Sequence, residues 1–157
     1  MYVETIPGYY PDGSSWRYYN VSHPVGQGLV SFRDDVMLVQ WFLNEIFYNH
    51  PSYQSQWLPD GDLEIDGKCG PITAEWILQF QVDSIGLAPL YPDGRVDKAP
   101  GGTTHSWRGS RYTIVWMNEK MRDIYPGLYG AGGMLTIPAT CPGMLSAMIA
   151  QIGPLGP

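Results

Sequence analysis

A sharp turn that leads directly into a helix is the feature that most constrains this chain. In the stretch LEIDGKCGPITAEWILQFQ, residues 63–81, the pair Asp66-Gly67 is typical of a tight turn. Gly70 can serve as an N-cap, and Pro71 suits the first position of a helix. The helix is predicted to end near Gly86. Its buried face is predicted to contain apolar residues spaced four apart, Ile72, Trp76 and Phe80.

Two further segments have the spacing of helices. Residues 34–49, DDVMLVQWFLNEIFYN, have apolar side chains on almost every side, so we expect this helix to be covered nearly all round. Residues 112–125 have one apolar stripe opposite charged residues, and Pro126 and Gly127 end that helix. The chain is therefore predicted to be mainly α, with a small three-helix domain over residues 34–125.

The two ends of the chain differ from this middle part. Residues 1–33 hold six tyrosines and tryptophans without helical spacing, which predicts an extended, aromatic-rich arm. Residues 126–157 form a neutral tail rich in Gly, Pro and Met, with one short helix predicted within CPGMLSAMIAQIG, residues 141–153. Because a solvated tail is normally charged, we expect this one to pack against another surface.

Net charge and the N-terminal sequence exclude several functions. The 157 residues have a formal net charge of -6, which argues against nucleic acid or an anionic membrane surface as a partner. The start, MYVETIPGYYPDG, lacks the features of a signal peptide, and no apolar run predicts membrane insertion. We therefore expect a protein made in the cytoplasm, as a component of a virion or another particle.

The order of the motifs resembles the peptidoglycan-binding-like domain family, a three-helix cell-wall-binding module. Over residues 34–97 the resemblance rests on the steps Val39-Gln40, Asp66-Gly67-x-Cys69-Gly70-x-x-Thr73, Phe80-Gln81, Gly86-Leu87 and Asp93-Gly94-x-Val96. It implies a non-catalytic module that binds cell-wall glycan or peptide, often beside a hydrolase domain. It also implies structural roles for Gly67, Gly70 and Thr73 rather than ligand contacts.

Three departures from the family pattern are visible. Cys69 stands where the family has an aromatic or aliphatic residue. Residues 97–111 are an insertion, because the family starts its last helix within a few residues of the second turn. The arm and the tail also lie outside the pattern. These departures leave the register of the third helix open.

No metal site is predicted. Asp62, Glu64 and Asp66 mimic the start of a calcium loop, but Thr73 stands where such a loop needs a bidentate glutamate. The run, which also includes Asp60, therefore predicts a solvated acidic turn. The three histidines lack the spacing of a zinc site and are scattered along the chain at His23, His50 and His105.

No catalytic pair or cofactor is predicted either. Nothing in the sequence marks Cys69 and His105 as a nucleophilic pair, and we expect Cys69 to be a small buried hydrophobe. Glu45 and Glu75 lie near tryptophans, as a pair of glycosidase carboxylates would, but solvated helix positions explain them more simply. The chain is therefore predicted to be non-enzymatic.

The aromatic and apolar residues provide the remaining functional signal, since Trp and Tyr suit both sugar stacking and protein interfaces. The candidates for glycan or interface contacts are Trp41, Trp76, Tyr91 and Trp107. The candidates for assembly contacts are Tyr9, Tyr10, Trp16, Met144, Leu145, Met148 and Ile149.

Two functional hypotheses follow. The first is a structural subunit of a larger assembly, such as a phage virion or tail-like particle, whose arm and tail bind neighbouring subunits. The alternative is a stand-alone peptidoglycan-binding module that targets a separate hydrolase or particle to the wall. The first hypothesis assumes that the chain has more apolar surface than one small core can bury. It also requires that the chain's own ends do not cover that surface.

Overall fold

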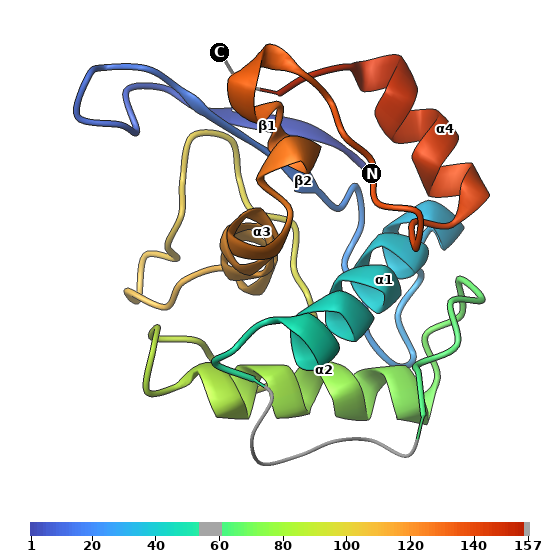
Figure 1. Cartoon of the computed structure of the whole chain (residues 1–157). Coiled ribbons are helices and arrows are strands. Elements are labelled where there is room, and N and C mark those ends of the chain that lie inside the picture. Colours follow the sequence, from blue (N-terminus) through green and yellow to red (C-terminus); the bar gives the residue numbers. More distant parts are fainter. Residues whose placement is uncertain (54–60, 156–157) are drawn as a thin grey trace.

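The computed structural model describes residues 1–53 and 61–155, and within these ranges the chain is mainly α (Figure 1). The helices are α1 (Arg33–Asn49), α2 (Pro71–Ser84), α3 (Thr113–Ile124) and α4 (Gly143–Ile152). An antiparallel hairpin of β1 (Tyr2–Ile6) and β2 (Trp16–Asn20) precedes them, and the 3-10 helices η1 (Pro126–Tyr129) and η2 (Ala131–Gly133) lie between α3 and α4. The prediction of a mainly α chain is confirmed.

Helix α1 lies at the centre of the molecule, in contact with α2, α3 and α4 (Figure 1). Met37, Trp41 and Phe42 lie outside its main apolar stripe and are nevertheless buried, so the helix is covered nearly all round as predicted. Part of this cover comes from the C-terminal segment, where Thr140 Oγ1 accepts a 3.3 Å hydrogen bond from Trp41 Nε1. In the described part of the chain, no helix combines the length and apolarity that crossing a membrane requires.

Helix α2 begins as the local sequence dictates. Gly67 adopts a φ of +75°, which favours glycine, and Pro71 occupies the first turn after the N-cap Gly70. Trp76 and Phe80 are buried as predicted, but Ile72 is 67% exposed, so its predicted place in the core is wrong. At 100° per residue, Ile72 lies about 40° from Trp76 on the helix surface, which is enough to bring it to the edge of the buried face.

Residues 1–33 do not form an extended arm. Strands β1 and β2 pair from Tyr2 opposite Asn20 to Ile6 opposite Trp16, and the hairpin folds back onto α3. The side chain of Asn118 on α3 accepts a hydrogen bond from Tyr19 N at 3.0 Å and donates one to Tyr19 O at 2.8 Å. In β2 the side chains of Trp16 and Tyr18 lie on one face and that of Tyr19 on the other, and all three are buried, so both faces of the strand are covered.

The neutral tail also folds back onto the same molecule. Helix α4 occupies the predicted position, and it packs Leu145 and Ile149 against the core beside α1. Leu155 is buried as well, so arm, middle and tail share one hydrophobic core. The predicted assembly contacts at Trp16, Leu145 and Ile149 are therefore wrong, because the chain's own packing removes these side chains from the surface.

Candidate functional site

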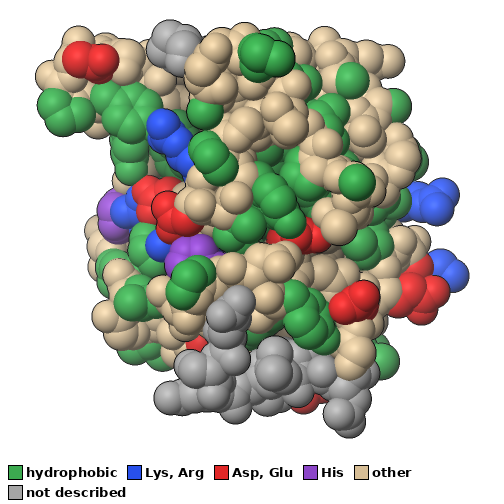
Figure 2. Space-filling view, in the orientation of Figure 1, with side chains coloured by type: hydrophobic (Ala, Val, Ile, Leu, Met, Phe, Trp, Pro, Cys, Tyr) green, Lys and Arg blue, Asp and Glu red, His purple; other side chains and the backbone are tan. Residues whose placement is uncertain are grey.

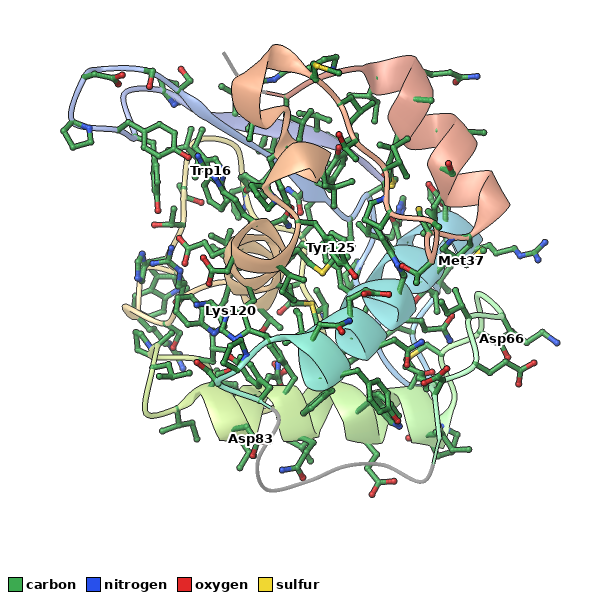
Figure 3. All side chains as sticks on the ribbon, viewed as in Figure 1. Trp16, Met37, Asp66, Asp83, Lys120 and Tyr125 are labelled. Atoms are coloured by element: carbon green, nitrogen blue, oxygen red, sulfur yellow. The ribbon has the colours of Figure 1, made fainter. Side chains whose placement is uncertain are left out.

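A buried glutamine organises the first turn. Gln40 on α1 donates from Nε2 to Asp66 Oδ1 at 3.0 Å, to Lys68 O at 3.0 Å and to Thr73 Oγ1 at 3.1 Å. Its Oε1 accepts the Gly67 amide at 3.0 Å. Figure 3 shows the labelled Asp66 at this turn, next to the start of α2. Gly67 and Thr73 thus have structural roles, in agreement with what the resemblance implied.

A second buried glutamine repeats the arrangement one helix later. Gln81 on α2 donates from Nε2 to Asp93 Oδ1 at 3.1 Å, to Arg95 O at 2.9 Å and to Thr113 Oγ1 at 3.0 Å. Its Oε1 accepts the Gly94 amide at 2.8 Å. We call each set of bonds a glutamine network. The second network fixes Thr113 at the start of α3, which settles the register that the sequence left open.

The insertion before α3 forms a small hydrogen-bonded loop, the Trp107 hairpin (residues 104–112). His105 and Arg111 pair as an antiparallel bridge, and Ser106 N donates to Ser110 O at 2.7 Å. The base of this hairpin is tied to the rest of the chain by the Arg111 amide, which donates to Pro89 O at 2.8 Å. The tip presents Trp107, which is 88% exposed, with the Arg108 guanidinium 4.8 Å from its ring centroid.

A cleft of about 220 Å³, the Trp107 cleft, lies between this hairpin and the second turn. Its lining consists of aromatic, charged and hydroxyl side chains: Tyr91, Asp93, Arg95, Asp97, Ser106, Arg108, Ser110, Arg111, Tyr112 and Thr113. Figure 2 shows acidic, basic and histidine side chains gathered at the edge of the molecule where this segment runs in Figure 1. Tyr91 is 68% exposed, so one aromatic side chain of the lining is accessible from solvent.

The charges of the cleft are only partly paired. Arg95 Nη2 lies 2.7 Å from Asp97 Oδ1, and Arg111 is paired with Glu119 while lying over the ring of Trp116. Arg108 has no carboxylate within 4.0 Å among the described residues. The cleft thus offers an unpaired guanidinium, hydroxyl groups and flat aromatic surfaces, which suit a hydroxylated ligand with an anionic group.

The structure places the four predicted contact residues in different environments. Tyr91 lines the Trp107 cleft, and Trp107 is exposed between the lining residues Ser106 and Arg108 without being part of the lining itself. Trp41 and Trp76 are buried, and their predicted role as contact residues is wrong. The sequence analysis did not identify the charged residues of the cleft, such as Arg108. The insertion itself was the available signal, because loops that depart from a scaffold often carry binding residues.

The remaining predicted assembly contacts lie in different environments. Tyr9 is partly exposed and donates from its hydroxyl to Glu119 Oε1 at 2.8 Å. Met144 on α4 is partly exposed. Tyr10 and Met148 are half-buried against the core.

The side chains considered as catalytic residues lie in different environments. Burial raises the pKa of the Cys69 thiol, which disfavours the reactive thiolate, and His105 instead forms a 2.7 Å hydrogen bond with Thr104. Glu45 is buried rather than solvated, contrary to prediction, and its carboxylate accepts a 2.5 Å hydrogen bond from the Tyr125 hydroxyl. Figure 3 shows the labelled Tyr125 between α3 and α1. Within residues 1–53 and 61–155, no three metal-binding side chains cluster, and Asp60 lies outside this range.

Comparisons with known proteins add no further constraint on this site. No family model, no curated protein and no solved structure matches the chain. Any functional conclusion therefore depends on the motif resemblance and on the geometry described above.

Proposed function

We propose that this chain is a non-enzymatic binding module for cell-wall glycan, with a peptidoglycan-binding-like three-helix core and the Trp107 cleft as its binding site. The observation that carries the proposal is the 88% exposure of Trp107 at the tip of a hydrogen-bonded hairpin. A large aromatic side chain held in water contributes little to folding, so a ligand that stacks on it gives a reason for its position.

Two features of the site support a sugar as the ligand. Tyr91, in the lining of the cleft, and the exposed Trp107, next in sequence to the lining residues Ser106 and Arg108, provide flat surfaces on which the apolar face of a sugar ring can pack. Ser106, Ser110 and Arg108 line the same cleft and can form hydrogen bonds with ring hydroxyls or with a carboxylate. Convergent polar groups beside an aromatic wall are typical of small-molecule sites.

The two glutamine networks support the peptidoglycan-binding-like core. They occur at the residues on which the sequence resemblance rests, the Gln40 and Gln81 steps and the turns at Gly67 and Gly94. Each network fixes the angle between one helix and the start of the next. α1, α2 and α3 then form the scaffold, and the insertion carries the binding residues.

A sedimentation assay with purified peptidoglycan tests the proposal. We expect the wild-type chain to pellet with the wall material, and Trp107→Ala and Tyr91→Ala to reduce the bound fraction at least tenfold. Phe32→Ala is the matched control, because Phe32 is also an exposed aromatic residue but lies outside the cleft. A wild-type chain that stays in the supernatant, or a Trp107→Ala variant that binds normally, contradicts the proposal.

One observation supports a second candidate function, that of a structural subunit of a phage virion or tail-like particle. Four apolar side chains remain exposed along and just beyond α2, at Leu78, Val82, Ile85 and Leu87. The first three are spaced by four and three residues, so they form a row on one side of the helix. The apolar surface of α1 no longer supports this candidate, because the chain's own ends cover it.

Light scattering during size-exclusion chromatography tests the second candidate. A subunit that uses the row on α2 is expected to form oligomers that Val82→Glu converts into monomers. Gln151→Glu, at an exposed position on α4, is the control for added charge. A monomeric wild-type chain at all accessible concentrations contradicts this candidate.

A further inference from the structure

A second cavity, of about 250 Å³, lies where the N-terminal hairpin, the end of α3 and the C-terminal segment meet. We call it the arginine cavity. It is lined by residues from all three of these segments: Tyr10, Asp12, Ser14, Ser15, Trp16, Arg17, Arg122, Pro126, Tyr129, Ala131 and Leu155. The Trp107 cleft shares none of these residues, so the two sites are separate.

Aromatic rings with unpaired polar groups form one wall of the arginine cavity. The Trp16 side chain, labelled in Figure 3 next to β2, is only 3% exposed and stacks on Tyr18 with 5.0 Å between ring centroids. Its indole Nε1 and the hydroxyl of Tyr10 are buried without a hydrogen-bond partner among the described residues. An unpaired buried donor is costly, and both of these residues line the cavity.

The charge of the arginine cavity is positive although the whole chain has a formal net charge of -6. Neither Arg17 nor Arg122 has a carboxylate within 4.0 Å in the described ranges. Arg122 lies over the Tyr10 ring, 4.9 Å from its centroid, which holds the guanidinium at the cavity.

One acidic residue, Asp12, lines the cavity, and its carboxylate already accepts hydrogen bonds from a neighbouring residue. The Asp12 carboxylate accepts hydrogen bonds from Ser14 N at 2.8 Å and from Ser14 Oγ at 2.6 Å. Its single negative charge balances at most one of the two guanidinium groups, Arg17 and Arg122. The cavity therefore retains positive charge that can attract an anion.

We propose that the arginine cavity binds a small ligand with a carboxylate, whose body packs against Tyr10 and Tyr129. The guanidinium groups of Arg17 and Arg122 pair with the carboxylate, because arginine binds this planar group with parallel hydrogen bonds. Two sources share the required chemistry, namely a carboxylated sugar and the C-terminus of a short peptide. The proposal does not depend on the Trp107 cleft, since no residue is common to both sites.

NMR titration of the ¹⁵N-labelled full chain tests the proposal, with the indole N–H signal of Trp16 as the readout. Trp16→Phe assigns this signal. The probes are N-acetylmuramic acid, N-acetylglucosamine as the matched sugar without a carboxylate, N-acetyl-D-alanyl-D-alanine and the amide of that peptide. We expect a saturable shift with at least one of the acids and none with its neutral counterpart. The acid that causes the shift identifies the source.

Variants separate this site from the Trp107 cleft. Arg122→Gln and Arg17→Gln are each expected to weaken binding of the active acid at least tenfold, whereas Arg108→Gln in the other cleft leaves it unchanged. Arg122 is exposed, so its variant keeps the test valid if Arg17→Gln does not fold. Equal shifts from acid and neutral probes, no shift from any probe, or unchanged binding by Arg122→Gln overturns the proposal. Shifts confined to the Trp107 indole also overturn it, and they leave the wall-binding function intact.

Discussion

The first and second turns of this molecule use the same glutamine network around loops of very different length. Gly67 and Thr73 are six positions apart, whereas Gly94 and Thr113 are nineteen apart. In both turns the glutamine amide bonds an aspartate, a backbone carbonyl and a threonine, and accepts a glycine N–H. The start of the next helix therefore depends on the glutamine network and not on the length of the loop between its ends.

The two turns also differ in what they expose. The short loop of the first turn places Cys69, half-buried, against the core. The long loop of the second turn forms the Trp107 hairpin and holds Trp107 in solvent. Because a longer loop costs only a little additional closure entropy, the second turn can carry a binding surface without disturbing the helices.

The largest expected effect tests whether the two networks are equivalent. Gln40→Met and Gln81→Met each remove a buried amide and leave a partly buried glycine N–H and several acceptors without a partner, so we expect each to lower the free energy of unfolding by about 3 kcal/mol. Urea unfolding followed by circular dichroism measures this. Gln79→Met on α2 is the control, with a change below about 0.5 kcal/mol expected at this less buried position. If only one of the two core variants is destabilised, the turns are not equivalent.

A smaller effect distinguishes the two glycines. Gly67 and Gly94 have φ values of +75° and +72°, so alanine at either position costs about 1 kcal/mol in backbone strain. A Cβ at position 67 would also lie 2.4 Å from Arg33 Cγ, whereas at position 94 the nearest atom is 3.5 Å away. We expect Gly67→Ala to lose about 2 kcal/mol and Gly94→Ala about 1 kcal/mol in the same unfolding assay.

A double variant checks the cause of that difference. In the Arg33→Ala background, the side chain that a Cβ at Gly67 would meet is gone. The cost of Gly67→Ala should then fall to that of Gly94→Ala. An undiminished cost would show that the Arg33 side chain does not cause the difference, and would assign it to the Arg33 carbonyl oxygen, 3.2 Å from a Cβ at position 67.

The pH dependence of the first turn is a weaker effect. Hydrogen bonds from Lys68 N and from the Gln40 amide hold the pKa of Asp66 below its usual value of 3.8. The stabilisation from ionised Asp66 is therefore present above pH 3.8 and is lost as the pH falls through the lower folded-state pKa. Between pH 7 and pH 3, we expect the Tm of wild type to fall further than that of Asp66→Asn. Equal decreases would mean that Asp66 contributes no pH dependence.

The smallest expected change in stability concerns the exposed loop. Trp107→Ala should alter the free energy of unfolding by less than about 0.5 kcal/mol, because the side chain packs against little of the protein. Phe80→Ala, at a fully buried position, should cost about 3 to 5 kcal/mol in the same experiment. A large loss for Trp107→Ala would assign this residue to the fold and remove the main support for the binding site.

The sequence by itself determined the helices and most of their ends. Local chemistry explains this success, since the Pro71 start, the Pro126 stop and apolar periodicity act within a few residues. The expected helix over residues 112–125 differs from α3 by one residue at each end. The candidate list for the site also included Tyr91 and Trp107, although the sequence did not separate them from the buried tryptophans.

Only the tertiary structure decided which aromatic residues are exposed. Trp16 and Trp41 are buried because segments distant in sequence cover them. For example, Asn118 of α3 forms a hydrogen bond with Tyr19 of β2, 99 positions earlier in the chain. The same long-range packing covers α1 with the neutral tail and leaves Trp107 at the surface. Burial depends on which parts of the chain meet in space, and no local pattern of residue types contains that information.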